Sequence, residues 1–333
     1  MNRILLEREC FDGSVLSKKS LESWYDTNNK ISDAIKQKIQ KIHRRGKKKI
    51  ESLLREIEDN IHKILLSSPE ELELWTIRID KDYPDIFSHK KKGKETSTKL
   101  GKELLDAFHY DYYRKNKLVE LAKKLNIKTC PYCNMHYTLF AEEGENKTDS
   151  LAKFQFDHFY DKCKYPMLSM SLYNLIPSCA VCNQGKSTRK LSLSFHPYHS
   201  DICKQFRFEL HDPIGSFCGE KIQDSINVDL IPKTNNKSEL DDFAKTFHLK
   251  ALYQRHGDIA QEVFYKAYEY PYYSNSNNFK WLTNASPKYI KRLWMGTYTD
   301  ENEIEKRPMT KFIQDLWEQA LKIKVKPEDI MEL

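Results

Sequence analysis

The chain has 333 residues, of which 39% are hydrophobic and 12% aromatic, and its formal net charge is +7. This composition excludes an intrinsically disordered chain, and the length predicts two or three domains. The first residues lack the apolar core and cleavage site of a secretion signal, and no apolar run approaches the roughly 18 residues that span a bilayer. We therefore expect a cytoplasmic protein without membrane contact, whose mild positive charge is compatible with a polyanionic partner.

The first predicted domain, residues 1–98, is helical and polar. Apolar residues between positions 35 and 65 recur at three- and four-residue steps, which predicts one amphipathic helix, or two that are broken near Gly46. This stretch contains a basic run, with Lys41, Arg44, Arg45 and Lys47. Two interpretations of the run stay open: a solvated helix face, or contacts with the DNA backbone.

The second predicted domain, residues 99–215, changes character along its length. Its apolar spacing predicts one helix over 104–125. Alternating and aromatic residues then predict strands at 136–140 and 153–157, joined as a hairpin by a polar loop. A short strand at 174–177 and a short helix within 180–190 complete this domain.

The third predicted domain, residues 216–333, is helical again. The apolar spacing predicts helices over 240–253 and 259–268, followed by a loop at 271–278. Ser286 before Pro287 has the pattern of a helix N-terminus, and a last helix is expected after Pro308.

Four of the eight cysteines form two C-x-x-C pairs, Cys130 with Cys133 and Cys179 with Cys182. Each such turn can place two thiolates on one ion, and two turns complete a closed, tetrahedral structural zinc site. The alternative is four ordinary buried cysteines, which the matching spacing of the two pairs disfavours. The remaining cysteines lack such pairing and are expected to be ordinary core or surface residues: Cys10, Cys163, Cys203 and Cys218.

Between the two pairs lies Asp157-His158, at the end of a predicted strand. Adjacent strand residues point to opposite sides, so one side chain can bind a metal while the other reaches a water molecule. Asn174 precedes the second cysteine pair, and Asn183 and Lys186 follow it. Alone, Asn174 is more often a turn or cap residue, and Lys186 and Arg189 are consistent with a solvated helix face.

The order C-x-x-C, D-H, N-L, C-x-x-C-N-x-x-K resembles the zinc-stapled branch of the HNH endonucleases, also called the ββα-metal or His-Me finger fold. The likeness covers roughly residues 128–200, and the last family position is asparagine here instead of histidine. It implies an α+β fold with a central zinc-braced ββα-metal module flanked by mainly α-helical regions. The stretch from His158 to Ser187 also resembles bacterial HNH proteins encoded beside ATPases or sensors in anti-phage defence systems, which implies a partner protein of that kind.

The resemblance implies a role for each matching residue. His158 would be the general base, and Asp157 and Asn183 would hold one Mg²⁺ or Mn²⁺ ion, since an amide oxygen also binds a hard cation. Asn174 would hold the loop that orients His158, while Lys186 and Arg189 would contact phosphate.

Two functions therefore stay open. The first is an endonuclease that cleaves DNA, with RNA not excluded, and the second is a zinc-stabilised module that binds nucleic acid or a partner without cutting. His196 and His199 could complete the site or touch the scissile phosphate, although a capped turn or a buried histidine is the commoner role. Packing roles are expected for His136 and Tyr160.

Overall fold

The computed structural model describes residues 4, 6–10, 13–27, 30–42, 48–91, 94–115, 117–143, 149–152, 154–213, 226–275 and 285–323. These residues form helices and small antiparallel two-stranded sheets, so the prediction of a mixed α and β structure is confirmed. None of the described helices is both long enough and apolar enough to cross a membrane.

The chain divides into two compact units. The N-terminal unit comprises residues 3–127 and 138–200, and the C-terminal unit comprises residues 1–2, 128–137 and 201–333. The three-domain division into residues 1–98, 99–215 and 216–333 stays a prediction.

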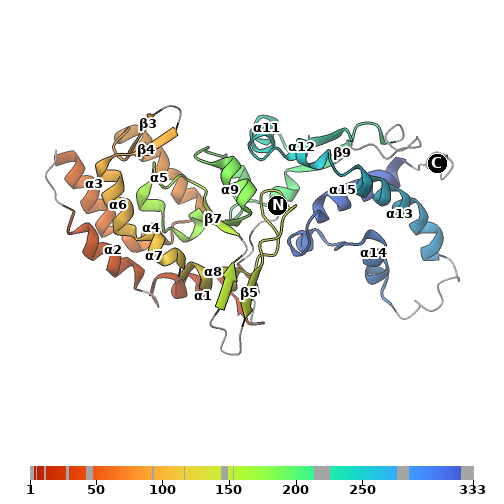
Figure 1. Ribbon diagram of the computed structural model, residues 1–333, viewed down its shortest axis with the longest axis horizontal. Helices are drawn as coiled ribbons and strands as arrows, with labels where there is room; N and C mark the ends of the chain where they lie inside the picture. Colours follow the sequence, from red (N-terminus) through yellow and green to blue (C-terminus); the bar gives the residue numbers. More distant parts are fainter. Residues whose placement is uncertain are drawn as a thin grey trace. The chain divides into compact units, whose positions relative to one another are not determined.

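The described part of the N-terminal unit is mainly helical and contains four antiparallel sheets of two strands each (Figure 1). Its helices are α1 (Lys18–Glu22), the π-helix η1 (Ser23–Thr27), α2 (Ile31–Ile39), α3 (Lys48–Asp59), α4 (Ile61–Leu65), α5 (Pro69–Asp82), α6 (Lys99–Phe108), α7 (Tyr110–Lys115), α8 (Lys117–Leu125) and α9 (Ala180–Lys186), with 3₁₀ turns at η2 (Pro166–Leu168), η3 (Leu172–Asn174) and η4 (Leu193–Phe195). Its larger strand pairs are β3 (Ser88–Lys91) with β4 (Lys94–Ser97), β5 (Phe140–Glu143) with β6 (Asp149–Ala152), and β7 (Gln155–His158) with β8 (Leu175–Ser178). The two-residue strands β1 (Arg8–Glu9) and β2 (Val15–Leu16) also pair.

The core of the N-terminal unit follows the apolar stripe of the sequence. The stripe residues are all buried: Ile35, Ile39, Ile42, Leu53, Leu54, Ile57, Ile61, Ile64 and Leu65. They lie on α2, α3 and α4 or just after α2, and α2 packs against α3, α4 and α6 (Figure 1). The amphipathic pattern is therefore confirmed, but it runs over three helices, α2, α3 and α4, where one or two were predicted.

The single helix predicted over 104–125 is wrong. His109 adopts a left-handed backbone conformation, with φ 55°, and ends α6. Two short helices, α7 and α8, follow it. Tyr112 of α7 is 57% exposed. Periodic apolar residues cannot reveal such a break, because each helix keeps its own apolar face.

The predicted pairing of strands 136–140 and 153–157 is also wrong. The hairpin forms between β5 and β6, with Phe140 opposite Ala152. Strand β7 instead pairs antiparallel with β8, which confirms the short strand expected near 174–177. Helix α9 begins directly after β8, so that the chain forms a ββα unit from β7, β8 and α9.

The C-terminal unit contains one described sheet and a set of packed helices (Figure 1). Its elements are η5 (Ile202–Lys204), β9 (Phe206–Leu210), β10 (Val228–Pro232), α11 (Lys237–Thr246), α12 (Leu249–Tyr253), α13 (Gly257–Asn275), α14 (Pro287–Met295), η7 (Glu301–Lys306) and α15 (Thr310–Ile323). Helix α15 packs against α13, α14 and the strand β9.

Two sequence predictions for this unit are wrong in detail. The helix over 240–253 is broken, because His248 adopts a left-handed conformation with φ 51° between α11 and α12. The loop expected at 271–278 is wrong for residues 271–275, because α13 continues through Pro271 to Asn275. Residues 276–278 lie outside the described part of the chain. Tyr270, the residue before this proline, packs on Trp317 of α15, with ring centroids 5.5 Å apart.

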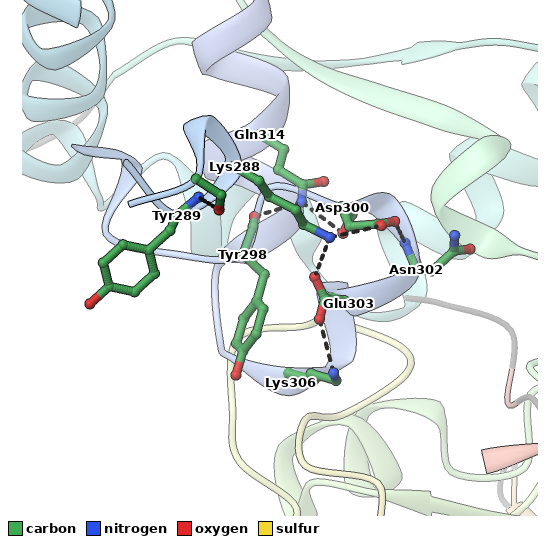
Figure 2. Close-up of polar contacts among 9 residues, drawn as sticks. Lys288, Tyr289, Tyr298, Asp300, Asn302, Glu303, Lys306 and Gln314 are labelled. Atoms are coloured by element: carbon green, nitrogen blue, oxygen red, sulfur yellow. Dashed lines mark hydrogen bonds and ion pairs between the residues drawn. The ribbon is translucent and has the colours of Figure 1, made fainter. Parts of the chain in front are cut away.

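The start of α14 is capped as the sequence predicts. The Ser286 hydroxyl accepts a hydrogen bond from the amide of Tyr289, and Pro287 occupies the first turn. Figure 2 shows the polar network that ties this helix to η7: the ammonium group of Lys288 lies 3.4 Å from Asp300 and 3.5 Å from Glu303. The Gln314 amide donates to the carbonyls of Tyr298 and Asp300, which joins α15 to the same turn.

Candidate functional site

The first C-x-x-C pair lies in a tight turn. The amide of Asn134 donates to the Cys130 carbonyl at 2.8 Å, and the amide of Met135 donates to the Cys133 sulfur at 3.4 Å. Asn134 adopts φ 50°, and its side chain donates to Thr129 and to the Ile304 carbonyl. The turn therefore presents the sulfur atoms of this pair from a backbone that is fixed by its own hydrogen bonds.

The second C-x-x-C pair begins the helix α9. Cys179 is the N-cap residue, and its sulfur accepts a hydrogen bond from the amide of Cys182 at 3.4 Å. The Cys179 carbonyl accepts from the Asn183 amide, so that the capped helix starts directly at the cysteine turn.

The structure brings all four predicted cysteines together. Cys130, Cys133, Cys179 and Cys182 are buried, and their sulfur atoms all lie within 4.8 Å of one another. Four thiolates at about 2.3 Å from a zinc ion are separated by about 3.8 Å, so this spacing suits a tetrahedral metal site. The cluster could therefore hold a zinc ion.

The other cysteines show no comparable grouping among the described residues. Cys10 and Cys203 are buried and Cys163 is half-buried, as expected of ordinary core or surface positions. Cys218 lies outside the described residues. Half-buried His136 has its Nδ1 atom 3.7 Å from the Cys133 sulfur.

His158 and Asp157 end the strand β7, opposite Leu175 and Ile176 of β8. The Nε2 atom of His158 lies 3.0 Å from the Ser169 carbonyl oxygen. Because a carbonyl only accepts, Nε2 carries the hydrogen and Nδ1 is the remaining ring nitrogen. Among the described residues, no group forms a hydrogen bond with Nδ1.

The surroundings of His158 favour its neutral form. The side chain is only 9% exposed, and the Tyr110 ring packs against it edge-on, with centroids 4.5 Å apart. Burial, together with the nearby charges of Lys162, Lys186 and Arg114, lowers the pKa of His158 to about 3, while the hydrogen bond to the Ser169 carbonyl acts in the opposite direction.

Asp157 and Lys186 form a buried ion pair. Asp157 is 2% exposed and Lys186 is fully buried. The ammonium nitrogen lies 3.3 Å and 3.2 Å from the two carboxylate oxygens and donates to the His158 carbonyl at 2.6 Å. Lys186 was predicted to contact phosphate, but in this conformation its charge faces inward and binds the end of β7.

Asn174 clamps the segment that follows β7. Its Oδ1 atom accepts from the Tyr160 amide at 2.7 Å, and its Nδ2 atom donates to the carbonyls of Tyr160 and Leu168 at 3.1 and 2.9 Å. Its own carbonyl accepts from the Phe159 amide. The asparagine therefore fixes the backbone on both sides of the turn that carries Ser169 to His158.

Asn183 lies on α9, next to the first residue of β7. Its amide nitrogen donates to Gln155 Oε1 at 2.6 Å, which leaves the amide oxygen as the atom that could bind a cation. Asn183 is half-buried, and Arg189 is exposed beyond the end of α9. Lys41 is exposed just after α2, whereas Arg44, Arg45 and Lys47 lie outside the described residues.

The histidines of the FHPYH stretch occupy different environments. His196 is fully buried, its Nδ1 atom accepts from the Tyr198 amide, and its ring packs on Phe159 with centroids 4.1 Å apart. Burial lowers its pKa to about 3. His199 lies near the surface and its Nδ1 atom lies 2.6 Å from Glu70.

Sequence reasoning missed the residues that surround His158 from outside its own motif. Tyr110 comes from α7, and Lys162 lies in the loop after β7 with its ammonium 4.4 Å from the centre of the Tyr110 ring. No spacing in the sequence connects α7 with β7, so this contact is visible only in the folded chain.

No family model, curated protein or solved structure matches this chain.

Proposed function

We propose that this chain is a metal-dependent endonuclease of the HNH type, which hydrolyses phosphodiester bonds in DNA. The observation that carries the proposal is the β7–β8–α9 unit, in which a strand ending in Asp157-His158 pairs with a strand that leads through a cysteine N-cap into α9. The helix carries Asn183, the third residue of the predicted set. A module that only binds nucleic acid has no need of a base beside two oxygen ligands.

His158 is proposed as the general base. Its Nε2–H group is anchored on the Ser169 carbonyl, so the lone pair of Nδ1 is the basic group of a ring that burial keeps neutral. Nδ1 would take a proton from a water molecule as the water oxygen attacks phosphorus and the 3′ oxygen leaves. The Asn174 clamp holds the turn with Ser169, and it thereby acts as a positioning residue.

The donor set beside His158 suits a hard divalent cation. The Asp157 carboxylate and the Asn183 amide supply oxygen atoms, which Mg²⁺ and Mn²⁺ prefer. The Lys186 ammonium now pairs with this carboxylate, 3.3 and 3.2 Å from its two oxygens, so a divalent cation would have to displace the ammonium or share the carboxylate with it. When bound there, a divalent cation would polarise the phosphate and stabilise the leaving oxygen.

The four cysteines are proposed as a separate, structural zinc site. All four ligand positions are thiolates, so no position is open for water or substrate. Zinc at this place would fix the start of α9, because Cys179 caps that helix. A partner protein of an anti-phage defence system stays a prediction from the resemblance.

The metal dependence of cleavage tests this proposal. Supercoiled plasmid DNA and an RNA of matched length are incubated with the purified full chain in Mg²⁺, Mn²⁺ or EDTA. We expect nicked or linear DNA with either metal, and none with EDTA. Intact plasmid under every condition, or cleavage of the RNA alone, would contradict the assignment.

A pair of variants separates the proposed ligand from its neighbour. Asn183→Ala removes the amide oxygen and is expected to reduce cleavage about 100-fold or more, whereas Gln155→Ala removes only the hydrogen-bond partner of that amide and should stay within a few-fold of wild type. Isothermal titration with Mn²⁺ is expected to show weaker binding for Asn183→Ala alone. Equal behaviour of the two variants would argue against Asn183 as a ligand.

A further inference from the structure

Two segments of the N-terminal unit, α7 and the loop after β7, meet at His158. The Tyr110 ring of α7 contacts the imidazole edge-on at 4.5 Å. The Lys162 ammonium, from the loop after β7, lies over the Tyr110 ring, 4.4 Å from the ring centre. Arg114 lies four residues after Tyr110 on α7, and side chains at this spacing share one helix face.

Lys162 and Arg114 carry charges that an anionic ligand can bind. Within the described part of the chain, no carboxylate lies within ion-pair distance of Lys162 or Arg114. The neighbouring Lys164, by contrast, is paired with Asp80 at 2.9 Å. A cation–π contact orients an ammonium group over a ring without neutralising it.

The charge of Arg114 acts on the Tyr110 hydroxyl. Burial raises the pKa of Tyr110 to about 12, and the positive charge of Arg114 opposes this rise. The carboxylates of Asp111 and Asp157 also act on the Tyr110 hydroxyl, in the direction opposite to Arg114. The Asp157 carboxylate is paired with the Lys186 ammonium. Among the described residues, the cations of this group without a close carboxylate partner are therefore Lys162 and Arg114, beside the Tyr110 ring.

We propose that Tyr110, Lys162 and Arg114 form a phosphate-binding shelf that holds the scissile phosphodiester of DNA beside the Nδ1 atom of His158. The inference rests on the proposed nuclease function and names the substrate contacts of the same site. Lys162 is half-buried and Arg114 is exposed, so both can reach a ligand, whereas Lys186 is fully buried. The shelf therefore takes the role that the sequence assigned to Lys186.

The shelf would place the phosphate close to the general base, as hydrolysis requires. A general base acts on a water molecule in contact with the phosphorus atom, so a phosphate must lie within a few ångströms of His158. Tyr110 touches both the imidazole and the ammonium of Lys162, and so sets the separation between the base and the cation. Cations on a nucleic-acid-binding protein that contact phosphate also make its affinity depend on salt.

The test is DNA binding without cleavage, measured by fluorescence anisotropy with a labelled 20-base-pair duplex in Ca²⁺ or EDTA over a range of salt concentrations. The double variant Lys162→Gln/Arg114→Gln is compared with Lys164→Gln/Lys115→Gln, which removes the same charge from the same loop and helix. We expect about 10-fold weaker binding for the first variant at about 0.1 M salt, and a slope of log affinity against log salt that is smaller by roughly 1.8, or about 0.9 per lost phosphate contact. The control variant should bind like wild type.

The outcomes separate this inference from the proposed function. If wild type cleaves DNA but both double variants bind with the same affinity and salt slope, the shelf is refuted and the nuclease stands. If binding depends on the shelf but no divalent metal supports cleavage, the nuclease proposal fails and the phosphate site remains. If wild type does not bind DNA at all, both are overturned.

Discussion

The buried pair of Asp157 and Lys186 allows a quantitative prediction about stability. Lys186→Met keeps most of the side-chain volume but leaves the Asp157 carboxylate, which is 2% exposed, without its cation. Breaking one side of a buried ion pair costs about 3–5 kcal/mol, because the remaining charge has lost its water and its partner. The loss of the hydrogen bond to the His158 carbonyl, 2.6 Å long, adds about 1 kcal/mol.

Urea denaturation followed by circular dichroism measures this loss as a change in the free energy of unfolding. Lys164→Met is the matched control, because the pair of Lys164 with Asp80 is 40% and 36% exposed and such surface pairs contribute about 0–1 kcal/mol. The double variant Asp157→Leu/Lys186→Met should recover most of the loss, since apolar replacement of both partners leaves no buried charge. A loss below about 1 kcal/mol for Lys186→Met, or no recovery in the double variant, would refute a buried pair that holds the end of β7.

Three further predictions follow from the same contacts. His196 is buried and its pKa is lowered to about 3, so the folded state favours the neutral form, and stability present above the unfolded pKa of about 6.5 is lost as pH falls. As the pH falls from 7.5 to 5, His196 should lower the free energy of unfolding by about 2 kcal/mol. His196→Phe should remove this part of the pH dependence of unfolding, and an unchanged pH dependence would contradict the prediction. Asn174→Ala removes three hydrogen bonds and should lower kcat for plasmid cleavage at unchanged zinc content, and an unaltered kcat would count against the clamp. Purified protein should carry about one zinc per chain by elemental analysis, and Cys179→Ser should reduce that content and destabilise the fold; a zinc-free, equally stable wild type would remove the zinc assignment.

Sequence patterns predicted the parts of the site that local geometry determines. Each C-x-x-C turn brings two sulfur atoms together within four residues, and both turns do so in the structure. The Ser286 cap of α14 is equally local. Such features depend on neighbouring residues, which is why a single sequence reveals them.

The features that sequence reasoning missed depend on contacts between distant segments. Lys186 stands on a helix with the spacing of a surface residue, and only the packing of α9 on β7 turns its charge toward Asp157. The partner of β7 was misassigned because alternation marks a strand but does not say which strand pairs with it. Likewise, the left-handed residues His109 and His248 interrupt helices whose apolar period continues on both sides.

Plasmid cleavage by His158→Ala tests the central claim most directly. The comparison uses wild type, His158→Ala and the control His199→Ala, which removes a histidine paired with Glu70 near the surface, at equal zinc content and in Mg²⁺. If His158 is the general base, its variant should cleave about 100- to 10,000-fold more slowly, while His199→Ala stays close to wild type. Cleavage by His158→Ala at the wild-type rate would contradict the account.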